Sequence, residues 1–185
     1  MSLVRLCYAS RATFKPYTID GMDRHVAEIL AQSRRNNQRR NLVGALYYAN
    51  GIFFQCLEGE EADIDALLVA LGEDDRHKDL KILSRTPIRE RAFRDWEMKF
   101  AMLDREIRQF LRDHGLGKFD PYRFSDAMTG ELVDVLLAAR DVQEDELLSV
   151  IGHPVVAARP SSPVTLLMLM CAVLAISLAA VLLNR

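Results

Sequence analysis

The sequence predicts an α+β fold followed by one C-terminal transmembrane helix. Three observations support this prediction: an aromatic-rich hairpin at residues 41–59, two amphipathic helical patterns at 22–37 and 60–71, and an uncharged apolar run at 164–183. The 185 residues are enough for one domain of ordinary size and an extra segment. The formal net charge of −2 at pH 7 excludes no class of partner.

The hairpin at residues 41–59 organises the predicted sheet. Its two apolar runs flank Asn50-Gly51, a dipeptide that tolerates positive φ at both centres of a type I′ turn, so the register is nearly fixed. Leu46 is then opposite Gln55, which is the only amide on its face. Burying a carboxamide without partners costs about 1–3 kcal/mol, so its partner is either a neighbouring backbone or hydroxyl group or a polar ligand lying on the sheet.

The strands and helices before and after the hairpin complete one sheet. A first strand at residues 3–10 places Tyr8 on the inward face, because alternate residues share a face. The helices at 22–37 and 60–71 carry apolar residues at helical spacing, and further strands are expected at 81–87 and 97–103. This β-α-β-β-α-β-β order predicts a ferredoxin-like sheet with both helices on the Gln55 face, since strand–helix–strand crossovers are right-handed.

The opposite face of the sheet is also apolar and needs a cover of its own. Three helical patterns in residues 104–151 are expected to be cap helices for it. Residues 152–163, rich in Pro, Ala, Ser and Val, are typical of a linker. The predicted domains are therefore 1–103, 104–151 and the linker, followed by the transmembrane helix.

The transmembrane helix is predicted from residues 164–183, which contain no charge and are long enough to cross about 30 Å of hydrocarbon. We expect a single-pass protein of the inner (cytoplasmic) membrane with its N-terminal body in the cytoplasm. Cys7, Cys56 and Cys171 show neither a disulfide pattern nor the spacing of a metal site, so no metal is expected.

Polar residues end the apolar stripe of the first helix. Ser33, Asn36 and Asn37 follow its apolar positions, which indicates a site, unless the two asparagines simply terminate the helix. The arginine-rich stretch 34–40 is a candidate for holding phosphate. Because no aromatic residues are interleaved with these arginines, no nucleic-acid partner is expected.

Five landmarks occur in a specific order along residues 1–103. They are Tyr8, Asn36-Asn37, Gln55, the run D-D-R-H at 74–77, and Trp96-x-Met98. Together with the hairpin pattern G-x-L-Y-Y…G-x-F-F-Q-x-L-E-G, they resemble the BLUF family of flavin-based blue-light sensors.

The resemblance implies an oxidised flavin, FAD or FMN, bound non-covalently between the two helices. The implied cofactor-binding residues are Tyr8, Ile29, Ser33, Asn36, Asn37, Leu46, Gln55, Asp74, Arg76 and His77. Asn37 would bond the carbonyl and ring-nitrogen edge, and Ile29 and Leu46 would pack on the ring. The phosphate end would be held by Asn36, Arg76 and His77, oriented by Asp74.

The resemblance also implies a photochemical switch and no catalytic residue. Tyr8 matches a tyrosine that gives up an electron and a proton after light absorption. Gln55 matches a glutamine that then changes its hydrogen bonding by rotation or tautomerisation, which shifts absorption to longer wavelength. Trp96 and Met98 match residues near this glutamine, and which of the two faces the flavin stays open at this point.

The function expected on this basis is a membrane-anchored blue-light photoreceptor without enzymatic output. It would signal through homo-oligomerisation or a downstream protein. Two alternatives are a small ferredoxin-like enzyme, such as an acyl-phosphate hydrolase using Arg35 and Asn37, and a flavin-free membrane-anchored adaptor. The colour of the purified protein separates the photoreceptor from both.

Overall fold

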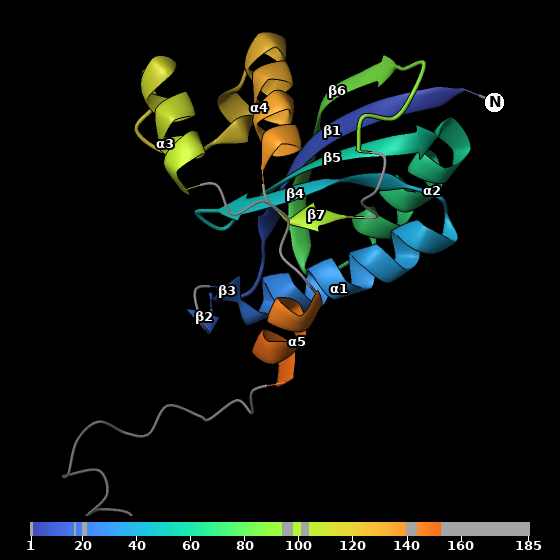
Figure 1. The fold of residues 1–185 in the computed structure, drawn as a ribbon, viewed down its shortest axis with the longest axis horizontal. Coiled ribbons are helices and arrows are strands. Elements are labelled where there is room, and N and C mark those ends of the chain that lie inside the picture. The colour runs from blue at the N-terminus through green and yellow to red at the C-terminus, as the bar shows by residue number, and fades with distance from the viewer. Residues whose placement is uncertain are drawn as a thin grey trace, which may run out of the picture. The chain divides into compact units, whose positions relative to one another are not determined.

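The computed structural model describes residues 2–16, 18–19, 22–93, 98–100, 104–139 and 144–152. Its centre is a five-stranded sheet in the order β6-β1-β5-β4-β7, in which β4 and β7 are parallel and the other neighbours antiparallel (Figure 1). The strands are β1 Leu3–Ala12, β4 Val43–Ala49, β5 Ile52–Glu60, β6 His77–Pro87 and β7 Lys99–Phe100. The predicted α+β fold is confirmed.

The hairpin has the predicted register. Leu46 pairs with Gln55, and the turn residues Asn50 and Gly51 both have positive φ, 54° and 74°. Directly across β1, Tyr8 also pairs with Gln55, so these three residues form one row on one face of the sheet. The register that places Gln55 among apolar neighbours therefore follows from the turn.

Other elements differ from the predicted boundaries. Strand β6 begins at His77, four residues before the predicted start at Lys81, because it is an edge strand whose side chains are mostly half-buried or exposed and whose hydrophobic pattern is therefore weak. Two short strands were not predicted: β2 Thr18–Ile19 lies in the predicted loop, and its partner β3 Met22–Asp23 occupies the first two residues of the helix predicted at 22–37, which begins at Arg24.

Helices α1, Arg24–Arg39, and α2, Glu61–Gly72, lie on the Gln55 face of the sheet (Figure 1). The Asp23 side chain caps α1 by accepting hydrogen bonds from the backbone N–H groups of His25 and Val26. After α1, Asn41 adopts a left-handed φ of 52°, which is the usual way in which an asparagine terminates a helix. Asn36 and Asn37 lie inside the helix and are not its terminators.

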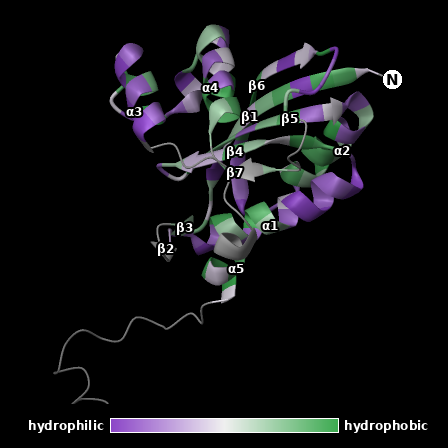
Figure 2. Ribbon diagram, in the orientation of Figure 1, coloured by the Kyte–Doolittle hydropathy of each residue, from purple (hydrophilic) through white to green (hydrophobic). Residues whose placement is uncertain are grey.

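The sheet separates two hydrophobic cores. Figure 2 shows hydrophobic residues mainly along the central strands, whereas α1 and α3 are largely hydrophilic. Helices α3, Asp104–Asp113, and α4, Asp126–Ala138, cover the face opposite α1 and α2, as predicted. Between them lies the 3-10 helix η1, Pro121–Arg123.

The prediction for the third cap helix is wrong. Helix α5, Glu144–Gly152, packs against α1, and its Val150 belongs to the core on the Gln55 face (Figure 1). The pattern of apolar residues shows that α5 has a face to bury, but it does not specify which surface receives that face.

Several predicted features lie outside the described residues. They are the linker predicted at 152–163 apart from Gly152, which ends α5, the transmembrane helix at 164–183, Trp96, and all but three residues of the fifth strand expected at 97–103. Within the described ranges, no helix combines the length and the apolar character that crossing a bilayer requires.

Candidate functional site

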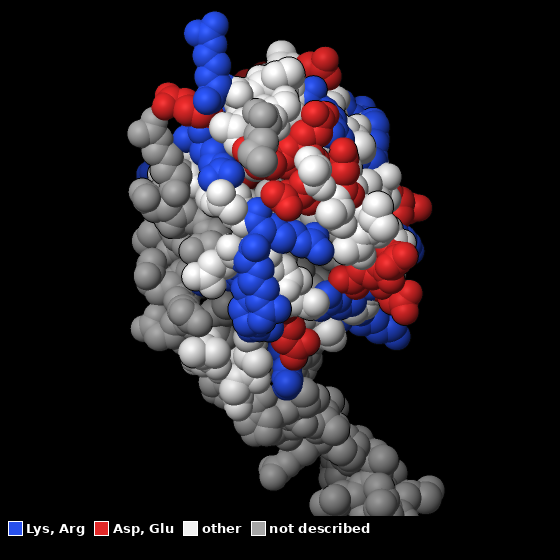
Figure 3. Space-filling model, turned by 90° about the vertical axis from the view of Figure 1, so that its right-hand side faces the viewer, with Lys and Arg blue, Asp and Glu red and all other residues white. Residues whose placement is uncertain are grey.

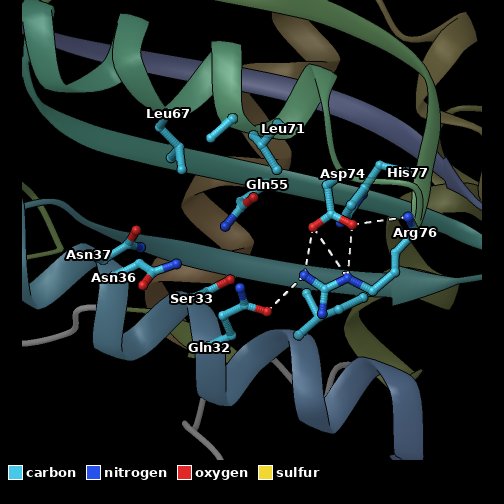
Figure 4. A pocket seen from close by; sticks show the side chains of 12 residues that line it. Gln32, Ser33, Asn36, Asn37, Gln55, Leu67, Leu71, Asp74, Arg76 and His77 are labelled. Carbon is cyan, nitrogen blue, oxygen red and sulfur yellow. Dashed lines mark hydrogen bonds and ion pairs between the residues drawn. The ribbon is translucent and has the colours of Figure 1, made fainter.

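A cleft opens between α1 and α2, with β5 as its floor (Figure 4). It holds about 540 Å³ of empty space, counting its open mouth. Its lining residues are Ile29, Gln32, Ser33, Asn36, Asn37, Gln55, Leu67, Ala70, Leu71, Asp74, Arg76 and His77. The structure thus brings four separate chain segments to one place.

Apolar side chains from both helices form the walls of the cleft. Ile29 comes from α1, and Leu67, Ala70 and Leu71 come from α2. Two facing apolar walls are suited to a flat aromatic ligand, with a few polar groups to orient it. The residues from α2 were missing from the predicted site, although their i, i+3, i+4 spacing shows that they share one helix face.

One end of the cleft is rich in amides. Asn36 and Asn37 point into it from α1, and Gln55 points into it from the floor (Figure 4). Asn37 is buried, and its backbone carbonyl accepts hydrogen bonds from the N–H groups of Arg40 and Leu42. Side-chain amides offer donors and acceptors together, so this end matches a ligand edge that carries both.

The other end of the cleft carries an ion pair. Arg76 donates from Nε to Asp74 Oδ1 at 2.9 Å and from Nη2 to Asp74 Oδ2 at 2.6 Å, a bidentate arrangement. The Arg76 side-chain bond lowers the pKa of Asp74 to about 2, and the same bond raises the pKa of Arg76. Arg76 Nη2 also donates to Gln32 Oε1 at 2.8 Å, a contact absent from the predicted site (Figure 4).

His77 is a neutral member of the site. Its Nδ1 lies 2.9 Å from Ser10 Oγ, and its ring centroid lies 4.8 Å from that of Phe53. Burial lowers the pKa of His77 below its ordinary value of 6.5, so the ring is uncharged at neutral pH. The positive charge at this end of the cleft therefore comes from Arg76.

Three buried side chains, Tyr8, Gln55 and Met98, are joined by hydrogen bonds at the floor of the cleft. The Tyr8 hydroxyl donates to Gln55 Oε1, and Gln55 Nε2 donates to Met98 Sδ at 3.2 Å. Burial, and then the charge of Asp74, raise the pKa of Tyr8 far above its ordinary value, so its hydroxyl stays protonated. The Gln55 amide thus has both a hydroxyl and a thioether as partners, and Met98 points inward.

Most of the predicted cofactor-binding residues meet in the cleft. Its lining includes Ile29, Ser33, Asn36, Asn37, Gln55, Asp74, Arg76 and His77. Tyr8 and Leu46 lie in the core on either side of Gln55, since both pair with it in the sheet.

Charges of both signs lie around the site. On the face shown in Figure 3, basic and acidic side chains are interspersed, and neither sign covers the face. Arg85, for example, pairs with Glu61 at 2.9 Å and with Asp65 at 2.6 Å. Among the described residues, no three His, Cys, Asp or Glu side chains gather as they would around a metal ion.

Comparison with known proteins identifies the family. The BLUF model, described as sensors of blue-light using FAD, matches residues 3–99. The photoactivated adenylate cyclase subunit beta of Euglena longa is 31% identical over 103 residues, which are 56% of this chain and 12% of that protein. Subunit alpha of Euglena gracilis is 32% identical over 91 residues, 49% of this chain and 8% of that protein. The chain therefore spans only a small part of these curated relatives.

Solved structures agree with this family. BlsA in its photo-activated state is 32% identical with a TM-score of 0.69, and the match covers 76% of this chain and 99% of the BlsA chain. BlrB, a BLUF protein in its dark state, is 27% identical with a TM-score of 0.59, and the match covers 74% of this chain and 96% of BlrB. In both cases nearly the whole solved chain is matched. The family model covers more than half of the 185 residues, and so the chain belongs to the BLUF family of blue-light sensors.

Proposed function

We propose that this photoreceptor binds an oxidised flavin non-covalently in the cleft between α1 and α2 and switches through Tyr8 and Gln55. The observation that carries the proposal is the buried hydrogen bond from the Tyr8 hydroxyl to the amide of Gln55, a residue whose side chain also lines the cleft. A hydroxyl and an amide are thereby coupled at the floor of a cleft whose two facing walls are apolar.

The residues present fit a flavin. The walls are apolar, Asn37 and Gln55 offer donors and acceptors at one end, and Arg76 offers a cation at the other. Asn37 would hold the polar edge of the ring, and Arg76, oriented by Asp74, would hold the phosphate end. We propose FAD as the physiological form, because the matched family model is described as using FAD. Releasing the cofactor by denaturation and separating FAD from FMN by chromatography tests this choice.

Tyr8 and Gln55 would form the switch. When bound, the oxidised flavin supplies the absorption of blue light and an excited state that accepts an electron. Tyr8 is protonated in the dark and so has both an electron and a proton to give. Without its proton the Tyr8 oxygen can only accept a hydrogen bond, so it no longer donates to Gln55 Oε1. A rotated or tautomerised amide can instead direct a hydrogen toward the Tyr8 oxygen. Rotation of the amide also ends the present N–H donation to Met98 Sδ, whereas a tautomerised amide keeps one N–H on that nitrogen.

Absorption spectroscopy of the purified protein tests this proposal. We expect a yellow protein whose absorption shifts reversibly to longer wavelength under blue light and returns in the dark. A colourless protein that cannot be loaded with FAD or FMN would refute flavin binding and favour the adaptor alternative. The hydrolase alternative needs Arg35 and Asn37 to converge, but Asn37 lines the cleft and Arg35 is an exposed residue that does not.

We further propose that the module signals by contact and is held at the membrane. The readout would be the short strand β7 and the helices that follow, acting on a second copy of the chain or on a downstream protein. The uncharged run at 164–183 supports a single-pass anchor in the inner (cytoplasmic) membrane, with the sensor in the cytoplasm. Deleting residues 160–185 should move a still photoactive protein from the membrane fraction to the supernatant. Retention of the truncated protein in the membrane fraction would refute the anchor.

A further inference from the structure

Met98 is held by two different contacts. Its sulfur accepts from Gln55 Nε2 at 3.2 Å, and its backbone carbonyl accepts from Arg34 Nε at 3.0 Å. The residue is only 1% exposed and directly precedes Lys99 and Phe100 of β7, which pair with Ala45 and Leu46 of β4. Met98 itself has no partner in this described register, and its two contacts from outside the ladder therefore help to position it.

Arg34 ties Met98 to a rigid element. It belongs to α1, a helix of 16 residues packed on the sheet, and directly follows Ser33, which lines the cleft. A hydrogen bond from a guanidinium to a carbonyl is charge-assisted, and such bonds are shorter and stronger than bonds between neutral groups. Any movement of the Met98 main chain away from Gln55 must therefore break or stretch the bond to Arg34.

A second anchor holds the connection that leads to Met98. On β5, three residues after Gln55, the carboxylate of Glu58 is fully buried. Its Oε2 accepts from the backbone N–H groups of Ala92 at 2.6 Å and Phe93 at 3.2 Å, while its Oε1 pairs with Arg5 at 2.6 Å. Glu58 thus holds the main chain at Phe93, which packs in the core on one face of the sheet. Arg34 holds the main chain at Met98, which packs in the core on the other face.

We propose that Arg34 is a positioning residue for the light switch, acting through Met98; this inference rests on the proposed function. Arg34 bonds the main chain of Met98, so its contact persists when the Gln55 amide turns its N–H away from the sulfur. Met98 then stays beside the amide, and the N–H to sulfur contact re-forms readily in the dark. Without Arg34, the dark arrangement returns more slowly because Met98 must first be reordered.

Dark recovery of the absorption shift tests this role in the full, flavin-loaded chain. Arg34→Ala should slow recovery by about twofold or more, a change typical of residues in direct contact. Arg39→Ala is the matched control, because Arg39 is an exposed arginine on the same helix. Arg34→Lys keeps a cationic donor and should restore part of the rate. In a Met98→Leu background, which lacks the sulfur acceptor, Arg34→Ala should have no further effect.

A second readout separates this inference from the proposed function. The carbon-13 methyl signal of Met98 in the dark, assigned with Met98→Leu, should shift or broaden in Arg34→Ala and stay unchanged in Arg39→Ala. This measurement needs no photochemistry. A wild-type protein without a light response would refute the proposed switch, and the Met98 signal would still show whether Arg34 positions Met98. An unchanged Met98 signal, or equal recovery rates in Arg34→Ala and wild type, would overturn the inference.

Discussion

Replacing Tyr8 with phenylalanine removes one hydroxyl from the centre of the protein. That hydroxyl donates to Gln55 Oε1, and both side chains are buried, Tyr8 at 1% and Gln55 at 6% exposure. In Tyr8→Phe, whichever end of the amide faces the ring has lost its partner, and leaving a buried polar group unsatisfied costs about 1–3 kcal/mol. We therefore expect the free energy of unfolding to fall by about that amount.

The same substitution should abolish the light response. Phenylalanine has no proton to give, while the walls and the polar ends of the cleft do not include Tyr8 and stay intact. The variant should therefore bind flavin and show no red shift. Thermal unfolding at equal cofactor concentration should give a melting temperature lower by roughly 2–12 °C, since 1 kcal/mol corresponds to about 2–4 °C for a protein of this size.

Tyr48→Phe is the control for this experiment. Tyr48 lies on the same face of the sheet, with its ring tilted against that of Phe53 at a centroid distance of 4.7 Å, but its hydroxyl is buried without a hydrogen-bond partner among the described residues. Removing that hydroxyl should leave the red shift in place and keep or slightly raise stability. A full red shift in Tyr8→Phe, or an equal loss of stability in the two variants, would refute the reasoning about Tyr8.

Three further substitutions probe the floor of the cleft, the packing between β4 and β5, and the cationic end of the cleft. Gln55→Leu should bind flavin but fail to switch, as absorption spectra before and after illumination would show, because no amide remains to rearrange. In Gly44→Ala the new methyl group would overlap the Cys56 carbonyl oxygen, so chemical denaturation should show a loss of about 1–3 kcal/mol or more, as in other overpacked cores. Asp74→Asn should remove part of the acid dependence of stability. The bond to Arg76 lowers the pKa of Asp74 to about 2 in the folded protein, whereas the pKa in the unfolded chain is about 4. The contribution of the Asp74 carboxylate to the free energy of unfolding is therefore complete above pH ~4 and is lost as the pH falls toward 2.

Each of these predictions has a contrary outcome, and the glycine substitution also has a control. Gly72→Ala adds the same methyl group where no described atom lies within 4 Å, and it should leave stability unchanged or raise it. Equal effects at both glycines would contradict the steric argument. For Asp74→Asn, the difference in free energy of unfolding between wild type and variant should become smaller from pH 6 to pH 3. A constant difference would show that the Asp74–Arg76 ion pair does not stabilise the folded protein. A light-induced shift in Gln55→Leu would remove Gln55 from the mechanism.

Local patterns were sufficient for much of the site. The Asn50-Gly51 turn sets the pairing of Leu46 with Gln55, because both turn residues accept positive φ. Strand alternation then places Tyr8 and Gln55 on one face, and helical spacing places Ile29, Ser33 and Asn37 on one side of α1. Periodicity is a property of neighbouring residues, so the sequence alone reveals it.

The cationic end of the cleft shows where this reasoning stops. The run of residues 74–77 was identified from the resemblance, yet only the structure shows the bidentate bond between Asp74 and Arg76 and the contribution of Gln32. It also shows that His77 is neutral, because burial lowers its pKa. Charge state depends on desolvation and on partners distant in the chain, and a local pattern contains neither.

By itself, the sequence determined the hairpin register, the order of strands and helices, and the inward placement of Tyr8 and Gln55, since each follows from residues a few positions apart. Only the tertiary structure decided that Met98 points at Gln55, that Arg34 holds its carbonyl, and that α5 packs on α1 rather than on the opposite face. The physical reason is that short segments, such as residues 98–100 and the nine-residue helix α5, can bury their apolar side chains against more than one surface. Which one they bury is decided by contacts between segments far apart in the chain.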